Sequence, residues 1–195
     1  PGQASEVTST PDRPSAFLGA GSNVPLDRPF TAAQVREAGV NRERLRQWLA
    51  QGLVVHPVQG AYYVAQLEDD LALRAACLRL VAPEDAVVTD HTAAWLHGAP
   101  MVLPPNAHVA VPPVAIYLPP GRRLRNKLAE SGERSLLTHE VTSVDGIRVT
   151  SLVRTTCDLG RQRHAARAFE AMCAMANVPE LDLRAFRREA DSPRF

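Results

Sequence analysis

Arginine and glutamine side chains gather on one face of a short segment that has the pattern of an amphipathic helix. Leu45, Trp48 and Leu49 stand at the i, i+3 and i+4 spacing of a buried helical face. The opposite face carries Arg42, Glu43, Arg46 and Gln47, with Arg44 beside it. In a DNA major groove, arginine can form paired hydrogen bonds with guanine, and glutamine with adenine. The pattern therefore favours a helix that binds DNA and contacts its bases. The alternative is a solvated helix face in a domain that binds protein.

Two helices and a hairpin are predicted around this face. A capping box that begins at Thr31 starts the first helix, and Asn41 is placed as the N-cap of the second. Two β-rich segments, residues 53–58 and 61–64, follow with turn residues between them. We interpret this order as a winged helix-turn-helix over residues 28–65.

The local charge supports this interpretation, although the overall charge does not. The chain of 195 residues has 22 basic and 21 acidic side chains, so bulk charge gives no argument for a nucleic-acid partner. Between Arg28 and Val64, however, five arginines and two glutamates give a local charge of +3. Helix N-termini also commonly contact phosphates. The candidate DNA-binding residues of this region are Arg28, Thr31, Asn41, Arg42, Arg44, Arg46 and Gln47.

A second basic cluster lies later in the chain. It comprises Arg122, Arg123, Arg125 and Lys127. A run of this kind is typical of a solvated loop. It equally offers phosphate contacts from a second domain, so these four residues join the candidate DNA-binding set.

No arrangement typical of catalysis or metal binding occurs in the sequence. Cys77, Cys157 and Cys173 are widely spaced in helical patterns, so we expect them to be reduced core residues. His91 and His97 are six residues apart, which places them on different sides of a helix. No phosphate-binding glycine loop and no nucleophile motif is found. We therefore expect no enzyme activity, no cofactor and no metal.

The rest of the chain predicts a second, mixed α/β domain over residues 66–195, so the fold class is α+β. Helical patterns alternate there with short β-rich segments, among them residues 136–141 and 146–149. Arg154 and Asp158 stand at i, i+4 in a predicted helix and so indicate a structural ion pair. A later helical pattern repeats apolar side chains at Ala165, Phe169, Met172, Cys173 and Ala176.

Residues 1–27 are rich in Pro, Ser, Thr and Gly, a composition that predicts a disordered arm. No stretch approaches the roughly 18 uninterrupted apolar residues of a membrane span. We therefore expect a soluble, cytoplasmic protein with no membrane partner.

Three stretches together carry a resemblance to a known family. They are Gly60-Ala-Tyr-Tyr-Val64, Val87-Val-Thr-Asp-His-Thr-Ala-Ala-Trp-Leu-His-Gly98 and Val149-Thr-Ser-Leu-Val-Arg-Thr-Thr-Cys-Asp-Leu159. With the helices before them, they resemble the AbiE-type abortive-infection antitoxins over about residues 30–178. The resemblance implies a type IV antitoxin, in which a winged-helix domain binds operator repeats and represses the operon. A C-terminal domain would then oppose a nucleotidyltransferase-like toxin.

On the family pattern, Arg42, Arg44 and Arg46 match the recognition helix, while the Ala93-Ala94 and Arg154-Asp158 motifs hold the second domain together. The family-like Ser-His-x-Ser is here replaced by Asp90-His-Thr-Ala93, with Thr92 as the hydroxyl.

The resemblance implies a sequence-specific DNA-binding antitoxin and autorepressor. Two alternatives stay open. One is a protein-interaction module that neutralises a toxin directly. The other is the DNA-targeting half of a Vsr-like nuclease without its catalytic domain, since relatives carry this front half fused to such a domain. The only lysine, Lys127, has no acid at the position that such a nuclease needs.

Overall fold

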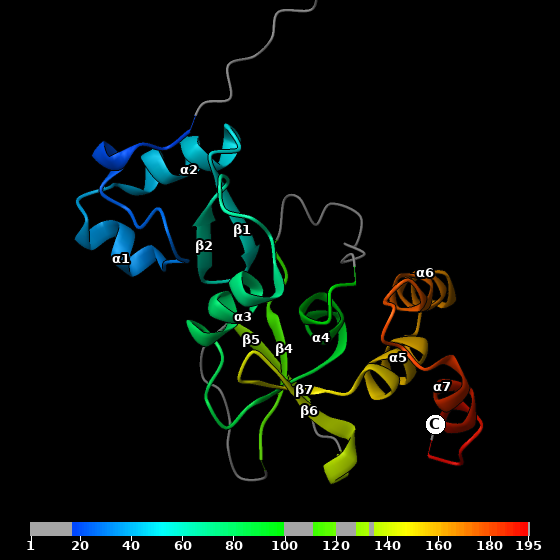
Figure 1. The fold of residues 1–195 in the computed structure, drawn as a ribbon. Helices are drawn as coiled ribbons and strands as arrows, with labels where there is room; N and C mark the ends of the chain where they lie inside the picture. Colours follow the sequence, from blue (N-terminus) through cyan, green and yellow to red (C-terminus); the bar gives the residue numbers. More distant parts are fainter. Residues whose placement is uncertain (1–16, 100–110, 120–127, 133–134, 195) are drawn as a thin grey trace, which may run out of the picture.

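The computed structural model describes residues 17–99, 111–119, 128–132 and 135–194. These residues form a small helical group with a hairpin, which lies against a larger group built on a mixed sheet (Figure 1). The α+β fold class predicted from the sequence is confirmed. Within the described ranges, no helix has the length and apolar character needed to cross a bilayer.

The smaller group holds the predicted helices and hairpin. Its elements are η1 (Ala20–Ser22), α1 (Ala32–Glu37), α2 (Arg42–Ala50), β1 (Val54–Val58) and β2 (Ala61–Val64). The Thr31 hydroxyl accepts a hydrogen bond from the Gln34 N–H at 3.3 Å, and the Gln34 side-chain oxygen accepts one from the Thr31 N–H at 2.7 Å. β1 and β2 pair antiparallel, and Phe30 forms a bridge to Tyr62 beside them. The capping box and the hairpin therefore occur where the sequence predicts them.

Part of the predicted disordered arm is folded. Residues 1–16 lie outside the described residues, but Leu18 and Val24 are each 7% exposed and join the core of α1 and α2. The Gln66 side chain also donates a hydrogen bond to the Leu18 carbonyl at 3.0 Å. The expectation that the chain is disordered as far as residue 27 is thus wrong. The few apolar side chains of this segment cover a hydrophobic surface that the two short helices leave open.

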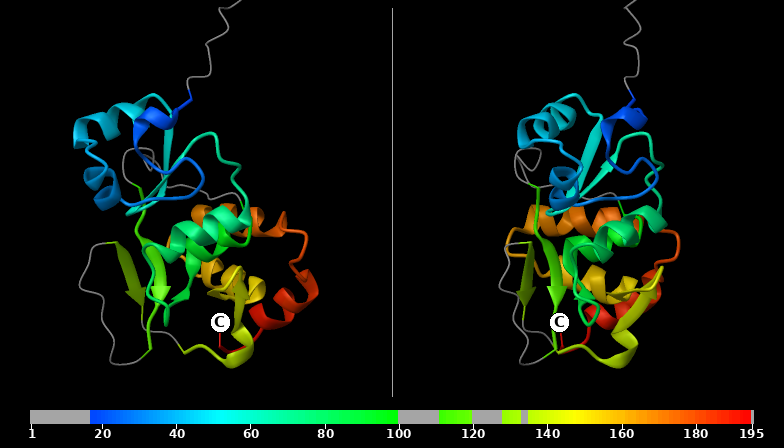
Figure 2. Two further views of the ribbon diagram at one scale, coloured as in Figure 1. Left: turned by 60° about the vertical axis from the view of Figure 1, so that its left-hand side comes forward. Right: turned by 90° about the vertical axis from the view of Figure 1, so that its left-hand side faces the viewer.

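The larger group begins at α3 and extends to the end of the described chain. Its elements are α3 (Leu71–Arg79), β3 (Val87–Val88), α4 (Asp90–Leu96), β4 (Val114–Tyr117), β5 (Ala129–Gly132), η2 (Thr138–Glu140), β6 (Val141–Val144), β7 (Ile147–Thr150), α5 (Leu152–Gly160), α6 (Ala165–Ala176) and α7 (Leu183–Ala190). The strand order is β5-β4-β3-β7-β6, in which β3 runs parallel to β7 and antiparallel to β4. α5, α6 and α7 form one group beside this sheet (Figure 2).

One predicted strand lies later than expected. The sequence pattern predicts a strand over residues 136–141, but the structure has the 3-10 turn η2 there, and β6 begins only at Val141. The Glu140 carboxylate accepts a hydrogen bond from the Leu137 N–H at 2.6 Å and closes this turn. A side-chain cap of this kind competes with strand pairing, and an apolar pattern does not reveal it.

α6 packs through the face opposite to the predicted apolar one. Ala168, Ala174 and Met175 are buried, whereas Phe169 is 65% exposed and Cys173 is also exposed. The expectation of a core position is therefore wrong for Cys173. The reason is that α6 is apolar on both faces, so its periodicity does not select the face that is covered.

The other two cysteines are buried, as predicted. Burial raises the pKa of Cys77 to about 12 and that of Cys157 to about 11, so both thiols stay protonated at neutral pH.

Both faces of the hairpin are buried. Val54 and Val64 belong to the core that α1 and α2 cover. Val58, Ala61 and Tyr63 belong instead to the core that α3, α4 and the five-stranded sheet share. The hairpin is therefore packed between the two groups of elements.

The hairpin turn is docked on the segment that leads into β4. The Gln59 side chain donates a hydrogen bond to the Val111 carbonyl at 3.0 Å, and its backbone N–H donates one to the Pro112 carbonyl at 3.3 Å. Gly60 follows with φ +91°, and a Cβ added there would lie 3.0 Å from Val81 and 3.3 Å from Leu128. The turn thus needs glycine for its backbone conformation and for the close approach.

We expect Gly60→Ala to destabilise the protein more than Gly146→Ala. Gly146 has φ +78° but open space around the added Cβ, so alanine there costs about 1 kcal/mol for the left-handed conformation alone. At Gly60 the added contact should cost about 1–3 kcal/mol more. Urea unfolding of both variants measures the difference, and equal losses would show that the turn is not closely packed.

Candidate nucleic-acid interface

α2 presents the predicted polar face to solvent. Leu45 is 7% and Trp48 4% exposed, and both pack in the core of the smaller group. Asn41 caps the helix, since its side-chain oxygen accepts a hydrogen bond from the Arg44 N–H at 2.8 Å. The exposed residues of the helix are Arg42, Glu43, Arg44, Arg46, Gln47 and Ala50. The sequence therefore identified the buried and the exposed sides of this helix.

The charged side chains of α2 make only weak contacts with their neighbours. Arg46 lies 3.6 Å from Glu43, with both side chains more than 60% exposed. Arg44 donates a hydrogen bond to Gln47 at 3.4 Å, and its guanidinium lies 5.7 Å from the centre of the Trp48 ring. Exposed pairs of this kind contribute less than about 1 kcal/mol. These arginines can therefore exchange their present partners for a phosphate or a base at low cost.

Two other candidate residues lie near the start of α1. The Thr31 hydroxyl and N–H are both used in the capping box, so Thr31 positions the helix. Arg28 is exposed and lies 3.9 Å from Asp27, which is an exposed and weak pair. The four residues of the second basic cluster, Arg122, Arg123, Arg125 and Lys127, lie outside the described residues.

The segment before α1 supports α2, which sequence reasoning missed. Leu18 and Val24 pack in the same core as Leu45 and Trp48. An open cavity of about 490 Å³ lies beside this contact and is lined by residues that include Leu18, Ser22, Asn41 and Arg44. A weak apolar signal, Leu18 and Val24 among polar residues, was the only sequence feature that could have indicated this packing.

An aromatic stack joins the hairpin to the strand bridge. The His56 ring lies 4.1 Å from the Tyr62 ring, and Phe30 stacks on Tyr62 at 6.2 Å. His56 Nε2 is buried and has no hydrogen-bond partner among the described residues. Burial lowers the pKa of His56 to about 4, because the charged imidazolium would lose its solvation. Burial also raises the pKa of Tyr62, while the nearby Arg42 lowers it.

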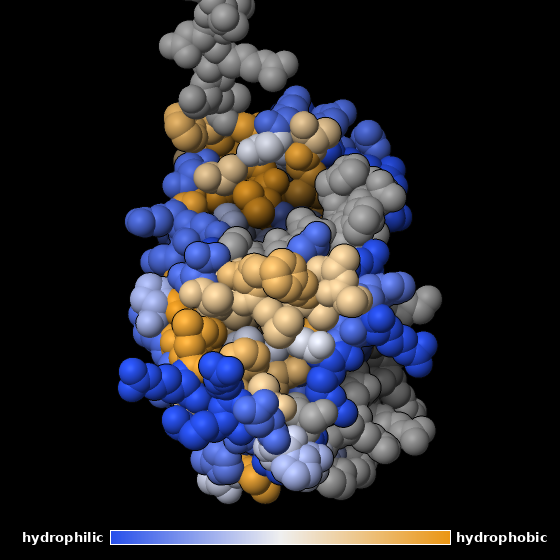
Figure 3. Space-filling view, turned by 90° about the vertical axis from the view of Figure 1, so that its right-hand side faces the viewer, coloured by the Kyte–Doolittle hydropathy of each residue, from blue (hydrophilic) through white to orange (hydrophobic). Residues whose placement is uncertain are grey.

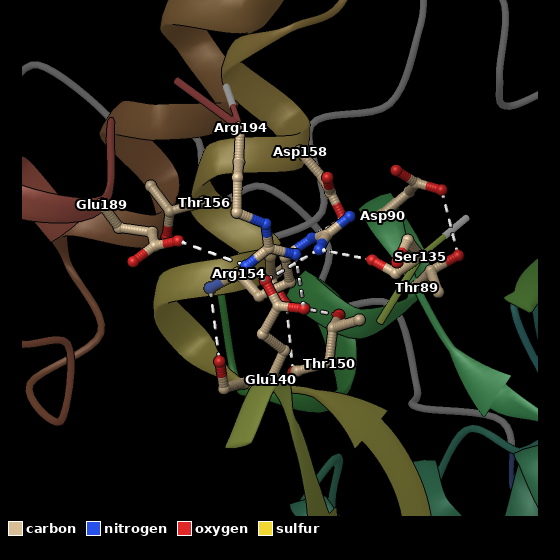
Figure 4. A network of polar contacts seen from close by, with 12 residues as sticks. Thr89, Asp90, Ser135, Glu140, Thr150, Arg154, Thr156, Asp158, Glu189 and Arg194 are labelled. Atoms are coloured by element: carbon tan, nitrogen blue, oxygen red, sulfur yellow. Dashed lines mark hydrogen bonds and ion pairs between the residues drawn. The ribbon is translucent and has the colours of Figure 1, made fainter. Parts of the chain in front are cut away.

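A buried polar network lies at the other end of the molecule, where η2 meets α5 (Figure 4). Arg154 lies 2.9 Å from Glu140 and 3.0 Å from Asp158, and all three side chains are less than 10% exposed. Arg194 lies 3.1 Å from Glu140. The predicted Arg154–Asp158 pair is confirmed, but Glu140 and Arg194 are distant in sequence and no local pattern links them to it.

This network favours the charged form of the Glu140 carboxylate. Burial alone would raise the pKa of Glu140, but hydrogen bonds from the Leu137 N–H, Arg194 and Arg154 outweigh burial and lower it. The carboxylate oxygens of Glu140 are thus engaged by donors of this chain. The arrangement ties η2 and α5 together and leaves Glu140 as a structural group.

The polar residues of the second resembling stretch are also used within the fold. The Thr92 hydroxyl is buried and accepts a hydrogen bond from the Ala115 N–H at 2.9 Å. The His97 ring donates to the Thr150 carbonyl at 2.7 Å, and the His91 ring lies 3.3 Å from the Pro113 carbonyl. In the part of the chain that the structure describes, no three acidic, histidine or cysteine side chains lie together as metal ligands would.

Comparison with known proteins defines the class of the chain. The family model described as the AbiEi antitoxin C-terminal domain matches residues 74–192, which is more than half of the sequence. The chain therefore belongs to the AbiEi antitoxin family. The family is regulatory rather than catalytic.

Among solved structures, the crystal structure of the RV2827C protein from Mycobacterium tuberculosis is similar, with 14% identity and a TM-score of 0.39. The match covers 83% of this chain and 65% of that chain, so this chain spans less than two thirds of that protein's length. No curated protein matches the sequence.

We expect His56→Phe to flatten the acid side of the stability profile. The pKa of His56 is lowered from 6.5 to about 4 in the folded protein, so its contribution is complete above about pH 6.5 and is lost as the pH falls toward 4. The loss is on the order of 1 kcal/mol, because solvent still screens part of the ring. Phenylalanine keeps the stack on Tyr62 and removes the titration.

Urea unfolding at several pH values between about 4 and 7 measures this effect as the difference between the two proteins. The carboxylates titrate equally in both and cancel in that difference. Parallel profiles would contradict the buried, neutral state of His56.

Proposed function

We propose that this antitoxin binds DNA sequence-specifically through α2 and represses its own type IV, AbiE-like operon. The observation that carries the proposal is the solvent face of α2, where Arg42, Arg44, Arg46 and Gln47 stand opposite the buried Leu45 and Trp48. Arginine and glutamine on one helix face match the donors and acceptors of the major groove. In this proposal Arg46 and Gln47 read bases.

The N-terminal end of α2 would contact the backbone. The Asn41 cap satisfies the Arg44 N–H. The two residues before Arg44 are exposed, and first-turn N–H groups have no partner within their helix, which is what lets helix N-termini bind phosphate. Arg28 and Thr31, at the start of α1, are placed in the same proposal as flanking contacts. The docked hairpin turn takes no part in this proposal, because half-buried Gln59 and Gly60 already contact Val111 and Val81.

The toxin is the second partner of the proposal. The antitoxin family implies a toxin, and we assign it to the nucleotidyltransferase-like class that the resemblance implies. Direct neutralisation through a protein contact is the competing function. It would leave α2 without a role in DNA binding, so a binding test on α2 separates the two. The protein acts in the cytoplasm in this proposal and has no catalytic step.

We expect replacement of Arg42, Arg44 and Arg46 by alanine to abolish operator binding. Removal of each arginine that pairs with a base or phosphate should cost about 1–3 kcal/mol, and Arg46→Ala or Gln47→Ala alone should relax specificity at one position. Mobility shifts on the protein's own promoter measure both effects. A matched control is the triple alanine variant of Arg184, Arg187 and Arg188, which removes the same charge from the exposed side of α7.

The control should bind as the wild type does. Unchanged binding by the α2 variant would contradict the proposal and favour direct neutralisation of the toxin. Equal weakening of both variants would mean that only overall charge matters.

We also expect the second basic cluster to contribute phosphate contacts. Each phosphate neutralised steepens the fall of log K with log salt by about 0.9 for duplex DNA. Neutralising Arg122, Arg123, Arg125 and Lys127 together should therefore reduce the slope by about two to four such steps and leave base preference intact. Fluorescence anisotropy across a salt series measures the slope. Equal slopes for the wild type and the neutralised variant would show that the cluster is a solvated loop.

A further inference from the structure

α6 exposes an apolar stripe although its other face is already buried. The helix has 12 residues, of which only Arg167 and Glu170 are charged. Its buried side chains, among them Ala168 and Met175, pack toward α5 and the segment after α6. The stripe consists of exposed residues on the opposite side, Ala166, Phe169, Cys173 and Ala176. A helix that is apolar all round is normally covered all round.

Figure 3 shows this face as a pale orange band across the middle of the molecule, with hydrophilic residues at its two sides and further apolar residues below it. The stripe residues are spaced by three, four and three positions. This spacing is that of a helix seam, in which side chains of one helix fit between those of another. The stripe therefore fits a second helix laid along α6.

The charges at the two ends of α6 indicate which helix that is. Arg163 precedes α6 and Arg167 lies in its first turn, whereas Glu180 follows the helix. The helix dipole disfavours cations at its N-terminal end and anions at its C-terminal end. Within the described ranges, Arg163 and Glu180 form no ion pair and no hydrogen bond through their side chains. Each end thus has the charge that the opposite end of an antiparallel copy would neutralise.

We propose that α6 binds α6 of a second copy of this chain in antiparallel orientation. The stripe runs from residue 166 to residue 176, so its midpoint is residue 171. Arg163 lies eight residues before that midpoint and Glu180 nine after it, just beyond the two ends of the helix, so the Arg163 end of one copy faces the Glu180 end of the other. Phe169 and Cys173 each lie two residues from the midpoint. The large Phe169 ring of one copy therefore faces the small Cys173 side chain of the other.

The proposal does not depend on DNA binding, although two copies would also present two α2 helices, as paired half-sites need. A seam of one short helix is a small interface, so association in about the micromolar range is expected. Sedimentation without DNA, across about two decades of concentration, should show a monomer–dimer equilibrium. A wild-type protein that stays monomeric up to about 100 μM would overturn the proposal.

Phe169→Asp tests the stripe, and Leu183→Asp is its matched control. Leu183 is 56% exposed and lies on α7, outside the stripe. Phe169→Asp should weaken dimerisation at least about 10-fold, whereas Leu183→Asp should leave it unchanged. Both sites are exposed, so thermal unfolding of the monomers should be unaltered. Equal dimerisation of both variants would place the interface elsewhere and overturn the proposal.

A charge exchange tests the orientation. Arg163→Glu and Glu180→Arg should each weaken the dimer, because like charges then meet across the pair. The double variant should restore it, since the exchanged charges again attract. A double variant as weak as the single ones would overturn the antiparallel arrangement.

Cys173 reports the same geometry in the native sequence. Cys77 and Cys157 are buried, which leaves Cys173 as the exposed thiol. In the antiparallel pair the two Cys173 residues lie about 6 Å apart along the helix axes, within reach of a short bismaleimide. Cross-linked dimers should form and disappear in Cys173→Ser. No cross-link at a concentration where the dimer sediments would overturn the arrangement.

Discussion

The packing of both faces of the β1–β2 hairpin is the constraint on which the rest of this structure depends. A two-stranded hairpin is at best marginally stable alone. Here Val54 and Val64 face α1 and α2, and Val58 and Tyr63 face α3 and the large sheet. The hairpin contributes to two cores, and through them the helix that carries the candidate DNA-binding face is held to the antitoxin domain. Its direction relative to that domain is set by apolar packing.

The docking of the hairpin turn also limits which parts of the hairpin are available to contact DNA. In a helix-turn-helix the recognition helix supplies the base contacts, and a free hairpin could add others. Here the turn is already engaged in contacts within the chain. Gln59 donates hydrogen bonds to the carbonyls of Val111 and Pro112, and Gly60 lies against Val81. In the proposed function, sequence specificity would then come from α2 and its flanks. The same packing gives the larger group a direct mechanical link to the position of α2.

The sequence predicted most of the local structure because its signals are local. Thr31 with Gln34 and Asn41 are caps within one turn, and Leu45 with Trp48 define one helix face. The sequence did not predict features that depend on contacts between residues far apart in the chain. Glu140 becomes a partner of Arg154 only after the sheet brings η2 to α5, and Leu18 reaches the core only once α1 and α2 have formed it. Neither has a periodic pattern around it.

α6 shows why periodicity alone is insufficient. Hydrophobic spacing tells which side chains share a face, but when two opposite faces are apolar the tertiary contacts choose between them. In α6 the fold buries Ala168, Ala174 and Met175, whereas Phe169 is exposed. The exposed face leaves the apolar area of Phe169 in water, and covering that area is what a second helix would gain.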